Sequence, residues 1–268
     1  MNGELDPLPL QARLVQVLAR LATSTQAAGR PIGSVRLIGV TKTRTPNELV
    51  DIARLGLRDL GANYLEETMP GIAAIKASGH VCSWHFIGQI QGNKTRLIAQ
   101  HFDWVHTVDR MRIAERLSAQ RAPGGEPLNV LIQVNFAHES SKGGVQSLDA
   151  LRELAAQVRC LPNLRLRGLM TIPPARAADP HAAFAEVAAA LTVLREDARA
   201  ADALRGDVCS AELDTLSMGM SDDFAAAIAA GATMVRIGTA LFGPRPGRMR
   251  RSPIPAQPNP QSDRESQL

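Results

Sequence analysis

The sequence predicts an α/β protein built as a single (β/α)8 barrel, and three observations lead to this fold class. Short apolar segments rich in β-branched residues alternate with longer amphipathic segments, which is typical of βαβ units and a parallel sheet. Eight such units follow one another in roughly 210 residues, as this barrel requires. A chain of 268 residues, 45% hydrophobic and 21% charged, is large and apolar enough to bury the core. A doubly wound open sheet is the alternative, because its parallel strands show the same local pattern.

An extra helix is expected before the first strand, over residues 8–28, where Leu14, Leu18 and Leu21 share one face and Gly29 ends the pattern. Strands are expected at residues 35–41, 59–63, 83–87, 104–108, 129–135, 165–170, 215–217 and 234–237. Helices are expected at residues 46–56, 65–78, 93–101, 110–120, 147–160, 181–204 and 221–230. Three of these helices begin with capping or first-turn signals, namely Pro46 with Glu48, Ser147 with Asp149, and Ser221 with Asp222 and Asp223.

The barrel domain is expected to end at Gly243, so that residues 244–268 form a disordered tail. Six of the seventeen prolines lie in this tail, among Arg, Ser, Gln and Asn residues. The tail also has five arginines against two acidic residues, so it carries most of the net charge of +4. The body is nearly neutral and lacks a basic stripe, so a nucleic-acid partner is not expected. The tail itself is either an inert extension or a contact for an acidic partner.

The three cysteines, Cys82, Cys160 and Cys209, are far apart and form neither a Cys-x-x-Cys pair nor a zinc-finger spacing. A reducing compartment and no bound metal are therefore expected. The first residues lack a basic segment followed by an apolar one, and no stretch approaches about 18 uninterrupted apolar residues. These features predict a cytoplasmic protein with no membrane segment.

Lysine is rare in this chain, and one lysine directly follows the first predicted strand. Lys42, Lys76, Lys94 and Lys142 stand against twenty-six arginines. A desolvated lysine can lose its proton and condense with a carbonyl, whereas arginine stays protonated and has no free amine. The working groups of this barrel type lie at the C-terminal ends of strands, so Lys42 is the candidate for Schiff-base formation, with a solvated loop lysine as the alternative. Lys94 and Lys142 are assigned either a supporting role or ligand contact, and Lys76 is expected to be exposed on a helix.

Two small-residue turns after the last two strands form a candidate phosphate site. The first contains Ser217, Met218, Gly219 and Ser221, and the second contains Gly238 and Thr239. Backbone N–H groups and serine hydroxyls can face an anion where such a turn enters a helix, and barrels often bind phosphate after strands seven and eight. An ordinary helix cap is the alternative for the first turn. A lysine at strand one opposite a phosphate cradle fits a phosphorylated aldehyde bound as an imine.

Arg236 lies inside the apolar segment of the eighth predicted strand, where a charged group needs a partner. One interpretation is an ion pair with a carboxylate at the floor of the barrel. The other is that Arg236 faces a pyridine nitrogen and keeps it unprotonated. The ring would then be a weak electron sink, which suits a racemase-like or purely binding role better than transamination.

With these residues, the sequence closely resembles the YggS/PROSC family of pyridoxal 5′-phosphate (PLP)-binding proteins, also called PLP homeostasis proteins. The resemblance covers about residues 8–243 and depends on residues 39–43, 61–64, 84–88, 91–94, 129–135, 141–142, 167–170, 216–223 and 235–239. It implies a barrel like the N-terminal domain of alanine racemase, PLP as the cofactor, and Lys42 as the lysine that forms the imine. It also implies that both turns are phosphate ligands, that Arg236 is near the pyridine nitrogen, and that Asn63 is beside the cofactor.

The sequence departs from the family pattern at three positions. Ala62 stands where relatives usually have Glu, Gln89 where many have Pro, and Arg44 where many have a second lysine close to the cofactor lysine. Ala62 puts a polar network near Asn63 in doubt, and Arg44 removes an alternative amine.

Three function classes remain open on the sequence. The first is a monomeric carrier that holds PLP, exchanges it with PLP-accepting apo-enzymes, and so affects amino-acid and keto-acid pools. The second is a PLP-dependent racemase of low activity, which would need a second base opposite the lysine. The only tyrosine, Tyr64, is interpreted as a packing or hydrogen-bonding residue at the barrel mouth. The third is a Schiff-base aldolase without a cofactor. The family resemblance favours the carrier, with no robust turnover.

Overall fold

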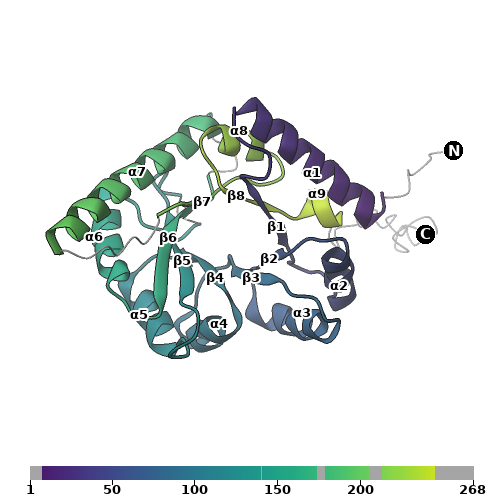
Figure 1. Ribbon diagram of the computed structural model, residues 1–268, viewed down its shortest axis with the longest axis horizontal. Helices are drawn as coiled ribbons and strands as arrows, with labels where there is room; N and C mark the ends of the chain where they lie inside the picture. Colours follow the sequence, from purple (N-terminus) through teal and green to yellow (C-terminus); the bar gives the residue numbers. More distant parts are fainter. Residues whose placement is uncertain (1–7, 140, 174–178, 206–212, 245–268) are drawn as a thin grey trace, which may run out of the picture.

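A computed structural model of the protein describes residues 8–139, 141–173, 179–205 and 213–244. Eight parallel strands follow one another around a closed barrel, and the helices form a ring outside it (Figure 1). The barrel closes where the first strand pairs with the eighth, with Leu37 opposite Val235 and Gly39 opposite Ile237. The predicted barrel is therefore confirmed, and the open sheet is excluded.

The strands lie within one residue of their predicted limits. They are β1 (Arg36–Val40), β2 (Asp59–Ala62), β3 (Ser83–Phe86), β4 (Trp104–Val108), β5 (Leu128–Val134), β6 (Leu164–Thr171), β7 (Thr215–Ser217) and β8 (Met234–Ile237). The expected helices are α1 (Leu10–Ala27), α2 (Pro46–Arg54), α3 (Leu65–Ala77), α4 (Thr95–His101), α5 (Met111–Gln120), α6 (Leu148–Arg159), α7 (Pro180–Arg205) and α8 (Phe224–Ala229). The start of the helix predicted at residues 93–101 is the 3-10 turn η1 (Gly92–Lys94), and α4 follows it. One short element, α9 (Thr239–Phe242), was not predicted.

Local capping explains where several helices begin. The Thr45 side chain accepts from the Glu48 amide and the Glu48 carboxylate accepts from the Thr45 amide, a complete capping box ahead of Pro46. Ser147 caps α6 by accepting from the Ala150 amide. The helix expected from residue 221 begins instead at residue 224, because the Asp223 carboxylate accepts from the Met220 amide and fixes a turn there.

Alternate side chains along each strand face the inside and the outside of the barrel. The outward set packs against the helices in one large apolar cluster that contains Leu37, Trp84 and Val235. The inward apolar set is small and consists of Ile38, Trp104, Leu131, Met170 and Met234. The same alternation also turns polar residues inward, and among them His85, His106, Ser217 and Arg236 are buried.

Gly168 is required by the irregular pairing of β5 with β6. The register shifts between Val130 and Leu131, and Gly168 has a φ of +148°. A Cβ at this position would lie 1.9 Å from the Thr215 carbonyl oxygen. We expect Gly168→Ala to lower the free energy of unfolding by about 3 kcal/mol, from backbone strain and crowding together. Urea unfolding measures this loss. Gly92→Ala, whose Cβ would meet nothing within 4 Å, is the control; equal stability of the two variants would contradict the expectation.

Within the described residues, none of the helices has the length and apolar character needed to cross a bilayer. The predicted tail, residues 244–268, lies outside the described part of the chain except for Pro244, so the boundary at Gly243 stays a prediction.

Candidate functional site

Lys42 lies just beyond the end of β1, at the C-terminal mouth of the barrel. The chain bends there, because the Thr41 amide pairs with the Gly61 carbonyl and Thr43 has a φ of +64°. The Lys42 side chain is partly exposed, and its Nζ lies 3.4 Å from the Tyr64 hydroxyl and 4.9 Å from the centre of that ring. Tyr64 thus contacts the lysine as a hydrogen-bonding and packing residue, which is the role expected for it.

Asn63 lies between β2 and Tyr64, next to the end of β3. The two chain segments touch closely, since a Cβ on Gly88 would lie 2.0 Å from the Asn63 carbonyl oxygen. Asn63, Tyr64, Gln89 and Lys94 line a hollow on this side of the mouth. The β2 and β3 ends therefore present amide groups and one ammonium beside Lys42.

The turn after β7 is built around Gly219, which has a φ of +93°. A Cβ there would lie 2.7 Å from the Ala227 Cβ, so only glycine fits between the turn and α8. The Met218 amide donates to the Met234 carbonyl, and the Met220 amide donates to Asp223. Among the described residues no acceptor pairs with the amide of Ser221, and its side chain is partly exposed.

The second turn lies against the end of β1. A Cβ on Gly238 would lie 3.4 Å from the Val40 Cβ, two residues before Lys42. The Thr239 amide opens α9 and has no acceptor within the described part of the chain. The Arg236 amide donates to the Gly219 carbonyl, which joins the two turns. Barrel closure thus brings unpaired amides of both turns to the β7, β8 and β1 side of the mouth, where Lys42 begins.

Arg236 is buried, and its guanidinium is held by three hydrogen bonds. Nη1 donates to the Ser217 carbonyl and to Ser217 Oγ, both at 2.7 Å, and Nη2 donates to the Thr171 carbonyl at 2.8 Å. Burial lowers the pKa of Arg236 to about 10. The direct ion pair with a floor carboxylate, one of the two interpretations of this residue, is not formed among the described residues. The Asp223 carboxylate acts on the Arg236 guanidinium only through its charge, and Asp59 is reached through other side chains.

Two histidines inside the barrel connect Ser217 to Asp59, and neither was among the predicted site residues. His106 Nδ1 lies 2.9 Å from Ser217 Oγ, His106 Nε2 lies 3.0 Å from His85 Nδ1, and His85 Nε2 lies 2.9 Å from Asp59 Oδ1. One feature of the sequence could have identified them: two consecutive strands each have a histidine at an inward position. We call Arg236, Ser217, His106, His85 and Asp59 the interior chain.

Burial lowers the pKa of both interior histidines, and the neighbouring His85 lowers that of His106 further. Both are therefore neutral in the folded protein at pH 7. Below their unfolded pKa of about 6.5, the unfolded chain binds protons that the folded protein does not, so stability is complete above that pH and falls on acidification. We expect His106→Asn to reduce the slope of unfolding free energy against pH below 6.5 by up to about 1.4 kcal/mol per pH unit.

Denaturant unfolding from pH 7.5 downwards measures this slope. His181→Asn, at an exposed position of α7, is the matched control and should leave it unchanged. A slope in His106→Asn as steep as in the parent protein would show that His106 does not carry the effect.

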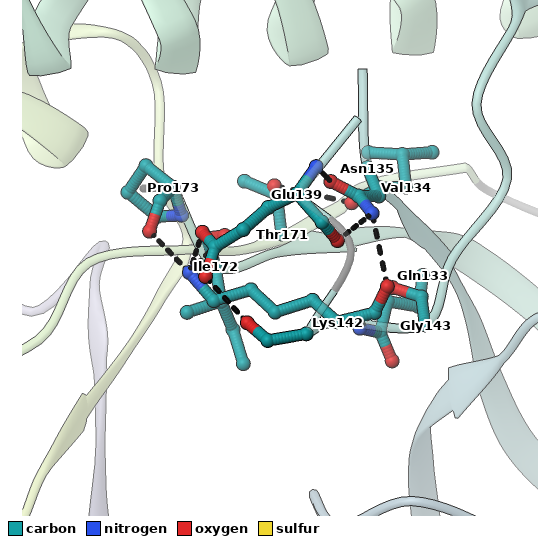
Figure 2. Close-up of polar contacts among 10 residues, drawn as sticks. Gln133, Val134, Asn135, Glu139, Lys142, Gly143, Thr171, Ile172 and Pro173 are labelled. Carbon is teal, nitrogen blue, oxygen red and sulfur yellow. Dashed lines mark hydrogen bonds and ion pairs between the residues drawn. The ribbon is translucent and has the colours of Figure 1, made fainter. Parts of the chain in front are cut away.

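Lys142 is tied to the β5 and β6 side of the mouth. Its Nζ donates to Glu139 Oε2 at 2.6 Å and to the carbonyls of Pro173 at 2.8 Å and Ile172 at 3.4 Å (Figure 2). The Asn135 amide nitrogen holds the same loop by donating to the carbonyls of Glu139 and Lys142 (Figure 2). The structure thus gives Lys142 a bridging role between two loops.

The other basic residues near the mouth or on the helices either have partners elsewhere or are exposed. Lys94 forms an ion pair with Glu66, and Lys76 is exposed on α3, as predicted. Arg44 donates to the carbonyls of Phe242 at 3.3 Å and Gly243 at 2.6 Å, so it holds the end of α9 rather than reaching the mouth. Ala62 is fully buried in β2. Of the four lysines, Lys42 is the one whose amine has no carboxylate partner among the described residues and lies at a strand end.

Comparison with known proteins gives a consistent result. The family described as alanine racemase, N-terminal domain, matches residues 16–246. The pyridoxal phosphate homeostasis protein of Pseudomonas aeruginosa PAO1 is 50% identical over 234 residues, which cover 87% of this chain and 94% of that protein. The protein of the same name from Escherichia coli K12 is 46% identical over 233 residues, covering 87% and 95%. The PLP-bound structure of PipY from Synechococcus elongatus PCC7942 has a TM-score of 0.74 at 30% identity, covering 88% of this chain and 100% of PipY.

Proposed function

The chain belongs to the pyridoxal phosphate homeostasis protein family, and we propose that it holds PLP at the barrel mouth through the Lys42 amine. PLP is the cofactor, and the role is in PLP homeostasis. The observation that carries the site assignment is the position of Lys42, whose amine is free of carboxylates among the described residues and lies beside the turns after β7 and β8.

The residues at the mouth fit a phosphorylated pyridine aldehyde. When bound, PLP supplies an aldehyde that condenses with a primary amine, and Lys42 presents such an amine at the end of β1. The amides of Gly219, Ser221 and Thr239 suit the phosphate, because unpaired main-chain N–H groups are good anion ligands. Among the lysines and arginines of the described residues, Arg236 is the one that is buried. An amine, an anion cradle and a guanidinium thus match the three functional groups of one ligand.

We assign roles to the remaining site residues on this basis. The turn formed by Ser217, Met218, Gly219 and Ser221, with Gly238 and Thr239, holds the phosphate. Asn63 lines the mouth beside the cofactor. Arg236 faces the pyridine nitrogen and keeps it unprotonated, which weakens the ring as an electron sink. Tyr64 orients the Lys42 amine through the 3.4 Å contact with its hydroxyl.

Borohydride reduction of the PLP-loaded protein, followed by peptide mass mapping, tests the assignment. The pyridoxyl group is expected on the peptide that contains Lys42, since Lys94 and Lys142 are engaged with Glu66 and Glu139. Label on either of those two lysines alone would overturn the proposed site. The absence of any label would overturn covalent binding itself.

We propose further that the protein is a carrier rather than a robust enzyme. The homologous proteins are named for homeostasis and not for a reaction. A racemase needs a second base opposite the lysine, and Tyr64 lies on the same side of the mouth as Lys42, in contact with it. Incubation with D- and L-alanine is expected to give only stoichiometric exchange. Sustained racemisation would favour the alternative, a PLP-dependent racemase of low activity.

The proposal extends to the cellular setting. We propose that the protein acts as a monomer in the cytoplasm and passes PLP to apo-enzymes that accept it. The widely separated cysteines support a reducing compartment, and the partly exposed amine of Lys42 supports exchange with other proteins. Mixing the PLP-loaded protein with an apo-aminotransferase and following the recovery of its activity tests the transfer.

A further inference from the structure

The interior chain has a single consistent direction of hydrogen bonding. Asp59 accepts from His85 Nε2, because a carboxylate has no proton to give. Neutral His85 then has a bare Nδ1, which accepts from His106 Nε2. Neutral His106 in turn has a bare Nδ1, which accepts from the Ser217 hydroxyl, and Ser217 Oγ accepts from Arg236 Nη1. Every donor in the line therefore points from the mouth towards Asp59 at the start of β2.

The two imidazole rings are fixed by packing. The His85 ring stacks on Trp104 with a centroid distance of 5.7 Å and an interplanar angle of 16°. The His106 ring meets the His85 ring edge-on at 5.1 Å and 74°. Arg36 lies 3.4 Å from Asp59 at the barrel floor and supports its negative charge. Because both rings are buried and fixed by these contacts, the interior chain has little freedom to rearrange.

Arg236 keeps two donors that this arrangement does not use. A guanidinium has five N–H groups in one plane. Both N–H groups of Nη1 and one of Nη2 go to Ser217 and Thr171, so the Nε–H and the second Nη2–H have no acceptor among the described residues. The bonds to Ser217 thus decide which edge of the guanidinium is presented to a ligand.

We propose that His106 and His85 are positioning residues for the cofactor, which act through Ser217 to orient Arg236 and present its Nε and Nη2 edge to the pyridine nitrogen. This inference rests on the proposed function, in which Arg236 faces that nitrogen. It also assigns the Ser217 hydroxyl to the interior chain, so that the phosphate depends on main-chain amides and on Ser221. A carboxylate at the floor of the barrel thereby helps to fix the electronic state of a cofactor at its mouth.

The first test needs no cofactor. Long-range ¹H–¹⁵N NMR of the unloaded protein reports the tautomer of each of the six histidines. Variants His85→Asn and His106→Asn identify the two signals. Both rings are expected to be neutral at pH 7 with the proton on Nε2. A proton on Nδ1 of His106, or a charged ring at either position, would overturn the interior chain as described.

The second test uses bound PLP. His106→Asn can offer its amide oxygen near the position of Nδ1 and so keep an acceptor for Ser217, whereas His106→Phe removes both ring nitrogens. His106→Phe is expected to shift the visible absorbance maximum of bound PLP. It is also expected to weaken PLP binding by about tenfold, which is the effect of losing one hydrogen bond from the charged Arg236 guanidinium to the ligand. His106→Asn should restore much of both. Thr215→Val, another buried inward position of β7, should lower stability without moving the spectrum.

The outcomes separate this inference from the proposed function. A parent protein that binds no PLP would defeat the proposed function, and the NMR result would still test the interior chain. A parent protein that binds PLP, with His106→Phe giving the parent spectrum and affinity, would defeat the inference alone. If His106→Phe does not fold, His106→Gln replaces it, because its longer amide reaches towards Nε2 rather than Nδ1 and leaves Ser217 without its acceptor.

Discussion

Lys42→Ala is expected to abolish the visible absorbance of bound PLP and to prevent its covalent capture by borohydride. Lys42 is the only lysine at the mouth whose amine is not paired with a carboxylate in the described structure, so no other amine replaces it. Arginine cannot substitute, because its guanidinium stays protonated. Absorbance spectra after dialysis against excess PLP measure the loss.

Lys42→Arg is the matched variant, since it keeps a positive charge near the Tyr64 ring and lacks a condensing amine. It should lose the absorbance as completely as Lys42→Ala. Lys76→Ala, at an exposed position on α3, should keep the full signal. Visible absorbance of the parent size in Lys42→Arg would mean that another lysine forms the covalent link.

The fold was predictable because its signals are local. Each strand is a short apolar segment, and each helix is marked by an apolar face, a capping residue or a terminating residue. The caps Thr45 with Glu48 and Ser147 act within a few residues. α9 escaped prediction because four residues are too few to show a helical period. The later start of α8 depends on one hydrogen bond from the Met220 amide to Asp223. The Ser-Asp-Asp sequence at residues 221–223 has the composition of a helix cap, so the sequence predicted an earlier start.

The candidate site was predictable only as far as strand ends determine it. Lys42 and the two glycine turns follow strands directly, so the barrel brings them to its C-terminal face whatever the conformations of their side chains. The partners of Arg236 depend instead on which side chains face each other across the interior. His106 and Ser217 are separated by 111 residues, and their contact follows from barrel closure and the inward register of β4 and β7. The bridge from Lys142 to Ile172 and Pro173 depends in the same way on two loops meeting.

Gly219→Ala is expected to weaken PLP binding by about tenfold or more, while Lys42 remains in place. The added methyl group would lie 2.7 Å from the Ala227 Cβ and 2.9 Å from the Phe224 Cα, and the φ of +93° is strained for alanine. The turn must therefore move away from α8. Its amides then no longer point to one place, and each charge-assisted hydrogen bond to phosphate contributes about 1.5–3 kcal/mol. Titration of the unloaded variant with PLP measures the change in Kd.

Gly231→Ala separates this effect from general destabilisation. Gly231 has a similar φ of +101°, but it follows α8 at the opposite end of the same β7 to β8 connection, away from the mouth. Both variants should lose stability through backbone strain, and only Gly219→Ala should lose affinity. Pyridoxal without its phosphate provides the decisive comparison, since its weaker binding should be nearly equal in Gly219→Ala and the parent protein. An equal loss for pyridoxal and PLP would place the phosphate elsewhere, because a misplaced anion cradle cannot weaken a ligand that has no anion.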